Sequence, residues 1–443
     1  MKRVVICIVC SLTLVAGWAG CSKRPRGTAH AVVEVKADIS NAGSAPSIEI
    51  DDTDWPQWRG LRSDGVALDQ PIPESWDEST NVAWKVDVPG HGHASPILVG
   101  SLVCLATAIE EQQTQIVVAY DRTTGEERWR LVVHEGGFPS KSEIHKKGTH
   151  ANSTLASDGQ SLYAVFFNSG KIFASAIGLD GKLHWQQEVG DFSSKFGYAP
   201  SPIVYENYLI VTADNWGNGY IAALHRDTGK VYWRTKRPAV STYSTPLIAK
   251  IHGRDQLVIS GCDEIVSYNP SNGEQLWACS AISEATCGTP VTDGSSIFAS
   301  GGHPDKQTVA IKGDGSGDIV WKNSTRIYEP SLLVANGCVF GVTDDGIAWC
   351  WSADNGKVHW KQRLGGSFSA SPILCNGKIF VPNLDGETFI FEAKSDAYHQ
   401  IARNKIGQDS YACLAIGGDA IFMRIGYSQG QQRNEKLICL RTP

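Results

Sequence analysis

The feature that most constrains this chain is a short pattern that returns along most of its length. A strand-like segment ends in a turn containing Asp or Asn and Gly, and a Trp follows within a few residues. From Trp233 onward the spacing is about forty residues, the length of four short antiparallel strands with their turns. The pattern therefore predicts repeated four-stranded sheets, the blades of a β-propeller. The repeated tryptophans are Trp129, Trp185, Trp233, Trp277, Trp321 and Trp360, and a degenerate copy ends at His399.

A second register supports the same fold. Each repeat has a pair of mostly small residues, here called the lead-in residues, followed by an apolar segment that we expect to form the innermost strand of a blade. Eight lead-in pairs predict eight blades. They are Ser95-Pro96, Ser153-Thr154, Ser201-Pro202, Thr245-Pro246, Thr289-Pro290, Ser331-Leu332, Ser371-Pro372 and Cys413-Leu414.

The two ends of the repeat region complement each other. After Cys413 the chain has three strand-like segments and no Trp strand, whereas residues 81–84 form a Trp strand, ending at Trp84, without a blade of their own. We expect this N-terminal strand to complete the last blade, which closes the ring and removes two exposed sheet edges. The sequence thus predicts an all-β, eight-bladed propeller with four-stranded blades. Trp84 and the six repeated tryptophans are interpreted as packing residues between blades.

These segments resemble the tryptophan-docking repeats of the quinoprotein alcohol dehydrogenase-like superfamily, the pyrroloquinoline-quinone (PQQ) repeat proteins. The leader, residues 54–77, begins Asp54-Trp55-Pro56-Gln57-Trp58-Arg59-Gly60 and resembles the opening of exported PQQ-repeat proteins. The resemblance implies the fold and leaves two activities open. Dehydrogenases of the superfamily use PQQ with calcium, whereas its BamB-type lipoproteins have no cofactor and act by binding partners.

The first residues indicate export. Lys2 and Arg3 precede an apolar run, residues 4–18, that is typical of a signal peptide and too short to span a membrane comfortably. The run ends in Trp18-Ala19-Gly20-Cys21, which resembles a lipobox with Cys21 as the lipidated residue, although Trp18 departs from that pattern. We expect a signal peptide at residues 1–21, a flexible linker at 22–52 and the propeller at 53–443. Ser22 follows Cys21 in place of the Asp that resembles an inner-membrane retention signal, which favours the outer membrane; we expect the protein in the outer membrane or the periplasm.

Charge and cysteine content exclude some functions. A net charge of -6 provides no basic surface for nucleic acid. The nine cysteines after Cys21 are scattered, and neither a Cys-x-x-Cys pair nor a Cys/His spacing indicates zinc, so we expect no metal. Cys338 and Cys350 flank a turn and could be joined across it or remain as two thiols.

The candidate ligand site is the face that carries the connections from each outer strand to the next blade, because loops on this face surround the central channel. Histidines there could bind a metal or an anion, and carboxylates with an exposed Trp could hold calcium or a sugar; solvated loops and tight turns explain the same residues. Catalytic residues cannot be assigned. The candidates are His91, His93, His145, His150, Asp214, Trp216, His303 and Asp305.

The sequence favours a monomeric, lipid-anchored scaffold of the cell envelope that binds another protein or a polymer, similar to BamB, and it favours no cofactor. The alternative is a PQQ-dependent dehydrogenase or another enzyme using the channel face. The chain has no adjacent Cys-Cys pair of the kind found above the quinone in methanol-type dehydrogenases, and no calcium-ligand motif can be carried over. Histidines and carboxylates converging in the channel would favour ligand chemistry.

Overall fold

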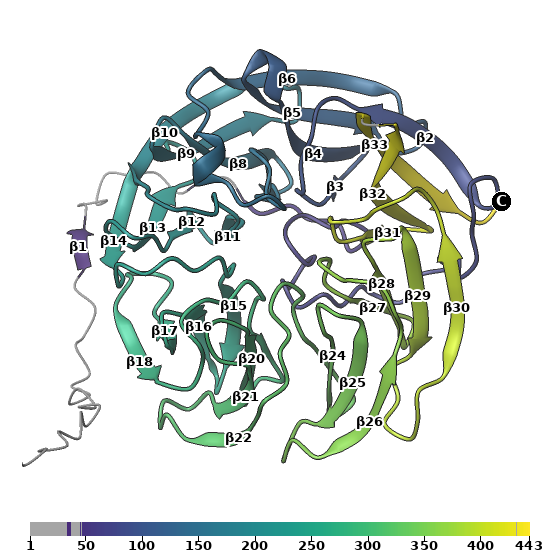
Figure 1. Cartoon of the computed structure of the whole chain (residues 1–443). Helices are drawn as coiled ribbons and strands as arrows, with labels where there is room; N and C mark the ends of the chain where they lie inside the picture. Colours follow the sequence, from purple (N-terminus) through teal and green to yellow (C-terminus); the bar gives the residue numbers. More distant parts are fainter. Residues whose placement is uncertain (1–32, 37–44, 46, 431) are drawn as a thin grey trace, which may run out of the picture. The chain divides into compact units, whose positions relative to one another are not determined.

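A computed structural model describes residues 33–36, 45, 47–430 and 432–443. The predicted signal peptide, Cys21 and most of the predicted linker lie outside the described residues. Within the described part, no helix is long and apolar enough to cross a membrane. The strands belong to one compact unit, Ala31–Pro443, and form eight antiparallel sheets arranged in a ring (Figure 1).

Each blade has four antiparallel strands, as the repeat predicts. Blades 1 to 4 contain, from the channel outward, β3 (Ile97–Val99), β4 (Leu102–Ile109), β5 (Thr114–Asp121) and β6 (Glu127–Glu135); β7 (Ala156–Ser157), β8 (Ser161–Asn168), β9 (Lys171–Gly178) and β10 (Leu183–Asp191); β11 (Ile203–Tyr205), β12 (Tyr208–Ala213), β13 (Tyr220–His225) and β14 (Val231–Lys236); β15 (Leu247–Ile251), β16 (Arg254–Gly261), β17 (Glu264–Tyr268) and β18 (Gln275–Cys279).

Blades 5 to 7 contain, in the same order, β19 (Val291–Thr292), β20 (Ser296–Gly301), β21 (Gln307–Lys312) and β22 (Ile319–Asn323); β23 (Leu333–Ala335), β24 (Cys338–Val342), β25 (Ile347–Ser352) and β26 (Val358–Arg363); β27 (Ile373–Cys375), β28 (Lys378–Pro382), β29 (Glu387–Glu392) and β30 (Gln400–Lys405). Two short 3-10 helices, η1 (Glu110–Gln112) and η2 (Lys141–Glu143), lie in loops of blades 1 and 2. Strand β1 (Val33–Lys36) pairs with β14 and adds a fifth strand to the outer edge of blade 3.

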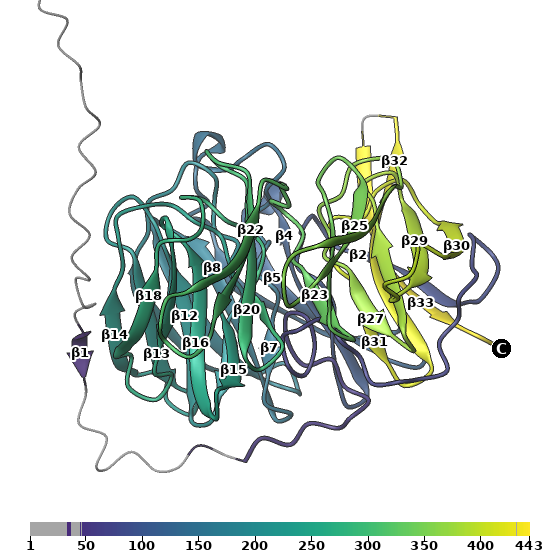
Figure 2. The same ribbon diagram turned by 90° about the horizontal axis from the view of Figure 1, so that it is seen from below.

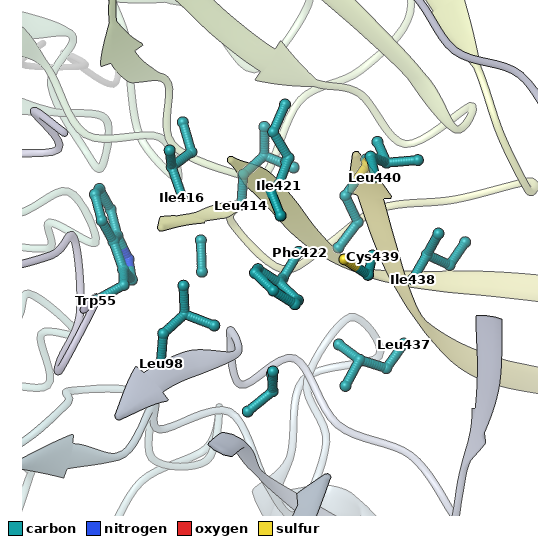
Figure 3. Close-up of a cluster of buried hydrophobic side chains, with 14 of the residues drawn as sticks. Trp55, Leu98, Leu414, Ile416, Ile421, Phe422, Leu437, Ile438, Cys439 and Leu440 are labelled. Atoms are coloured by element: carbon teal, nitrogen blue, oxygen red, sulfur yellow. The ribbon is translucent and has the colours of Figure 1, made fainter. Parts of the chain in front are cut away.

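Blade 8 closes the ring as predicted. It contains β31 (Ala415–Gly417), β32 (Ala420–Gln429) and β33 (Gln432–Arg441), and its outermost strand is β2 (Val82–Val88) from the start of the propeller. Val82 pairs with Leu440 and Val88 with Glu435. The junction with blade 1 encloses an apolar cluster in which Trp55 and Leu98 lie near Ile416 and Phe422 (Figure 3). Closure is therefore stabilised by strand pairing and by apolar burial together.

The repeated tryptophans pack between blades. In six junctions the ring lies against a turn glycine of the next blade, and a β-carbon on Gly356, for example, would come within 2.7 Å of Trp321. The indole N–H usually donates to a carbonyl of the same neighbouring turn, as Trp321 does to Ala353 at 2.7 Å. Trp277 differs from this pattern because its indole donates to Gln256 Oε1 in its own blade at 2.8 Å. The predicted packing role of these tryptophans is thus explained by a contact that only glycine permits.

The lead-in residues form a hydrogen-bonded circle around the channel. At seven of the eight blade junctions, the backbone N–H of a lead-in residue donates to a lead-in side chain of the next blade. At the closure of the ring, the next blade after blade 8 is blade 1. The bonds run from Ser95 to Thr154, Thr154 to Ser201, Ser201 to Thr245, Thr289 to Ser331, Ser331 to Ser371, Ser371 to Cys413 Sγ and Cys413 to Ser95, at 2.9 to 3.0 Å. Between blades 4 and 5, Thr289 Oγ1 instead accepts from the indole of Trp58 at 2.9 Å.

The leader crosses the channel. Trp55 forms an antiparallel bridge with Leu98 on the inner strand of blade 1, and Val66 forms a parallel bridge with Leu374 on the inner strand of blade 7. Between them, Trp58 reaches the start of blade 5 and Arg59 Nη2 donates to the carbonyl of Leu332 at the start of blade 6, at 2.6 Å. Residues 54–67 therefore cross the channel, and Figure 1 shows this purple segment at the centre of the ring.

All nine cysteines of the described residues are free thiols, and eight are buried. The strand register pairs Cys338 with Ser352 and Cys350 with Phe340, so the two cysteines are diagonal neighbours rather than direct partners. The structure therefore contains two thiols at this hairpin.

Two glycines of blade 6 test the docking contact. Gly337 and Gly356 both have a left-handed backbone, with φ of +71° and +68°, but a β-carbon on Gly337 meets nothing within 4 Å. We expect Gly337→Ala to cost about 1 kcal/mol of stability through backbone strain alone. Gly356→Ala should cost about 1–3 kcal/mol more, because it also displaces Trp321. Denaturant unfolding measures both, and equal losses would contradict the packing role of Trp321.

Candidate functional site

The mouth face is the face that carries the connections between blades, and its longest loop bridges the channel. Residues 136–155 connect β6 to β7, and Lys147 Nζ pairs with Glu329 Oε1 at 2.8 Å. Glu329 belongs to the connection that leads into blade 6, which lies opposite blade 2 in a ring of eight. Its second carboxylate oxygen accepts a hydrogen bond from Ser369. The channel is thus crossed at the mouth by this loop and on the other side by the leader.

The base of this loop is fixed against blades 1 and 2. Gln115 Nε2 donates to the carbonyl of His150 at 2.8 Å, and the His150 ring stacks on Phe138 with centroids 4.0 Å apart. Asn152 Nδ2 donates to the carbonyl of Tyr198 at 3.1 Å. Burial lowers the pKa of His150. Beside it, a cavity of about 10 Å³ has room for a single water molecule. His150 therefore has a packing role.

Two exposed aromatic side chains lie on neighbouring loops of the mouth face. Phe196 is 40% exposed and Trp216 is 49% exposed. The backbone N–H of Trp216 donates to Ser193 at 3.0 Å, which holds the two loops together. Phe196 also contacts His145 and Tyr243, with ring centroids 5.6 and 6.1 Å apart. These four residues, His145, Phe196, Trp216 and Tyr243, are called the aromatic patch.

His91 and His93 belong to a different group, at the junction of blades 8 and 1. Glu435 is buried there between Arg424, whose Nε is 2.6 Å from its Oε2, and Arg433. Burial raises the pKa of Glu435, but the two guanidinium groups and His91 outweigh it and hold the carboxyl well below its usual range. His93 stacks on Tyr411, with centroids 4.1 Å apart. This cluster is internally satisfied.

The two histidines have opposite shifts although they are two residues apart. The carboxylate of Glu435, whose Oε1 lies 3.7 Å from His91 Nδ1, raises the pKa of His91 above its ordinary value of 6.5. Burial lowers the pKa of His93 to about 3. His93 therefore has a structural role as a neutral, stacked ring, whereas His91 extends the charged network toward the surface.

The remaining candidates do not join a common site. Asp214 is buried and forms two hydrogen bonds of 2.7 Å with Arg237, so its carboxylate already has its partner. His303 and Asp305 are exposed, and their contacts with Ser283 are made through the main chain. In the described part of the chain, no three His, Cys, Asp or Glu side chains are grouped as metal ligands. The candidates thus lie in separate groups, and the convergence that would favour ligand chemistry is not seen among the described residues.

Three features escape the sequence patterns. Glu329 and Lys147 are 182 positions apart in the sequence, and only the closure of the ring brings them together. Phe196 lies in a Ser- and Gly-containing loop outside the repeat pattern, so no repeat position marks it as part of a surface patch. Arg59 is buried in the channel, whereas a leader ahead of a repeat domain is usually read as surface chain. A cavity of about 620 Å³ also lies on the opposite face, between Asp51, the leader residue Asp54 and blades 1 and 2.

The architecture defines a closed, eight-bladed propeller of the PQQ-like repeat class, with its channel occupied by its own leader. The chain belongs to the family described as outer membrane protein assembly factor BamB, which matches residues 113–362 and 305–397. None of the curated proteins matches the chain.

Solved structures share the fold at low identity. BamB from Moraxella catarrhalis is 14% identical with a TM-score of 0.57, covering 81% of this chain and 99% of that one. Quinohemoprotein alcohol dehydrogenase from Comamonas testosteroni is 11% identical with a TM-score of 0.65, covering 93% and 84%. A quinohemoprotein alcohol dehydrogenase from Pseudomonas putida HK5 is 11% identical with a TM-score of 0.60, covering 89% and 82%. These structures are one BamB and two quinohemoprotein alcohol dehydrogenases, and at identities of 11 to 14% the likeness establishes fold alone.

The shifts of His91 and His93 predict distinct titrations. In proton NMR, with signals assigned through His91→Asn and His93→Asn, His91 should titrate above pH 6.5 and His93 should stay neutral at pH 5. The unfolded chain takes up a proton at His93 below pH 6.5 and the folded chain does not, so stability falls between pH 6.5 and 3.

His93→Gln should reduce that acid loss, by at most about 2 kcal/mol at pH 5, when urea unfolding at pH 7 and pH 5 is compared with the wild type. If the two histidines titrate together, the assignment of His93 as a buried neutral ring is wrong.

Proposed function

We propose that this protein is an exported scaffold of the cell envelope that binds another protein through the aromatic patch on its mouth face. The observation that carries the proposal is the occupied channel. A propeller usually offers its axis to a small ligand, but here Trp58 and Arg59 of the leader contact the starts of blades 5 and 6 inside the ring, and the Lys147–Glu329 pair crosses the mouth. The surface left for recognition is the outer surface of the loops.

That surface has the character of a protein-binding site. Large exposed aromatic residues contribute most of the binding energy in many interfaces, because they bury much area at little cost in side-chain entropy. Trp216 and Phe196 are such residues, and they sit on loops held by a rigid sheet ring. Exposed Lys195 and Lys146 are the sequence neighbours of Phe196 and His145, and they add positive charge to the rim. An acidic or mixed rim on the partner fits this arrangement.

The family supports the same interpretation, since its description names an outer membrane protein assembly factor. We propose that Cys21 is lipidated and becomes the first residue of the mature protein, and that the linker tethers the propeller to the membrane. The docking of β1 on blade 3 supports a tether that runs along the outside of the ring. A partner engaged in assembly of outer membrane proteins then meets the mouth face.

A quinone enzyme is the less favoured alternative. Asp214 is committed to Arg237, and no set of carboxylates in the described residues is placed to hold calcium. The residues present do not fit a PQQ site in the channel, which the leader crosses. We therefore propose that the protein works without this cofactor.

Crosslinking tests the proposed surface. A photoreactive residue at position 196 or 216 should crosslink in cells to an envelope protein involved in outer membrane protein assembly, because these side chains face outward on the mouth face. The same residue at Val358, which is 44% exposed on an outer strand, is the matched control. Trp216→Ala should weaken binding of the captured partner by about tenfold or more, and Val358→Ala should not.

Two results would oppose the proposal. Crosslinks confined to position 358 would place the binding surface elsewhere on the propeller. Tight one-to-one binding of PQQ with calcium, measured by calorimetry, would favour the enzyme instead.

A further inference from the structure

The protein handles buried guanidinium groups in a consistent way, with one exception. Four arginines of the described residues are buried, Arg59, Arg226, Arg237 and Arg424, each at most 3% exposed. Arg226 pairs with Asp158, Arg237 with Asp214 and Arg424 with Glu435, and each of these carboxylates is itself buried. Such pairing is expected because a buried charge without a partner is strongly unfavourable. Arg59 has no carboxylate partner among the described residues.

Two guanidinium nitrogens of Arg59 have no hydrogen-bond acceptor in the described residues, and no carboxylate balances its charge. Nη2 donates to the carbonyls of Asp64 at 2.7 Å and Leu332 at 2.6 Å. Nε and Nη1 are buried without a hydrogen-bond partner in the described residues. Arginine carries five N–H donors and no acceptor, so these atoms require acceptors from outside the protein. Two carbonyl dipoles orient the group but supply no negative charge.

The nearest candidate anions of the chain are otherwise engaged. The Asp64 carboxylate accepts from Arg62 Nε at 2.8 Å and from the backbone of Val66 at 2.9 Å. The Cys413 thiol faces the same region, but burial raises its pKa, so it remains neutral. Burial also lowers the pKa of Arg59 to about 10, which still leaves it charged at neutral pH.

The backbone and the packing around Arg59 fix the position of its side chain inside the ring. Its backbone is left-handed, with φ of 62°, a conformation that is costly for a residue with a side chain. Its guanidinium occupies the position where a β-carbon on Gly65 would lie, 2.6 Å from Nη2. Positive φ at Arg59 and glycine at position 65 together direct the charge inward, toward the starts of blades 6 and 8.

We propose that Arg59 binds a small monovalent anion in the channel, a halide or a simple carboxylate, through Nε and Nη1. The anion supplies the negative charge that Asp158, Asp214 and Glu435 supply to the other three buried arginines. The proposal concerns the channel and is independent of the partner that the mouth face binds.

Anomalous diffraction tests it directly. The purified protein is crystallised from sodium bromide, and data are collected at the bromine edge. An anomalous peak within hydrogen-bond distance of Arg59 is expected, and none beside Arg237, the matched buried arginine that has its carboxylate. Crystals from sodium formate distinguish the second source, since a planar three-atom density there identifies a carboxylate. Density that fits only water in both crystals would overturn the proposal.

Thermal stability gives a second readout. The melting temperature should rise between about 1 and 100 mM chloride relative to gluconate at the same ionic strength, because gluconate is too large for a buried site. Arg59→Gln should abolish this difference, whereas Arg62→Gln, a change at an exposed neighbour, should retain it. If Arg59→Gln fails to fold, the wild-type comparison and the bromide crystals still decide the matter. Equal melting temperatures in chloride and gluconate would contradict the site.

Discussion

The ring of hydrogen bonds between lead-in residues is the interaction on which the rest of the propeller depends. Each bond joins the innermost part of one blade to that of the next, at a place where strands are only two to five residues long and have little pairing of their own. A side-chain hydroxyl is the natural acceptor there, because a backbone N–H buried beside the channel must be satisfied locally. Cys413 serves the same purpose with sulfur at the junction of blades 7 and 8. The tryptophans act farther out, where they fill the wedge between diverging sheets.

The leader takes part in this ring of hydrogen bonds as well as crossing the channel. At the junction of blades 4 and 5, where the circle is interrupted, Trp58 donates to Thr289. The same segment bonds to inner strands of blades 1 and 7 and to the start of blade 6. One extended segment thus ties together blades that are not neighbours. Because each contact is buried, the leader stabilises the ring far more than an equal length of surface chain would.

Periodicity made the fold predictable, and its limits explain what was missed. The repeated glycines and tryptophans mark a packing contact that recurs between blades. The spacing of these residues along the chain therefore predicts the number of blades and the closure of the ring by the strand that contains Trp84. The leader occurs once, and its hydrogen-bond partners lie up to 330 positions away, so no pattern could place it. Likewise Asp214 and His93 have the residue types of a loop site, yet one is neutralised by Arg237 and the other is held neutral by burial against Tyr411. Sequence identifies groups able to do chemistry, whereas their partners decide whether they remain available.

The two closures of the channel differ in strength, and the difference bears on function. On the leader side, backbone bridges and buried side chains hold residues 54–67 in place. On the mouth side, the loop 136–155 is held across the channel by Lys147 and Glu329, whose side chains are 37% and 24% exposed. An ion pair of that exposure contributes up to about 1 kcal/mol. A bound partner can therefore rearrange the mouth loop at little cost, while the leader and the ring remain fixed. The proposed scaffold role fits this arrangement, in which loops rearrange on a rigid ring. Little of the interaction free energy with a partner is then lost in deforming the protein.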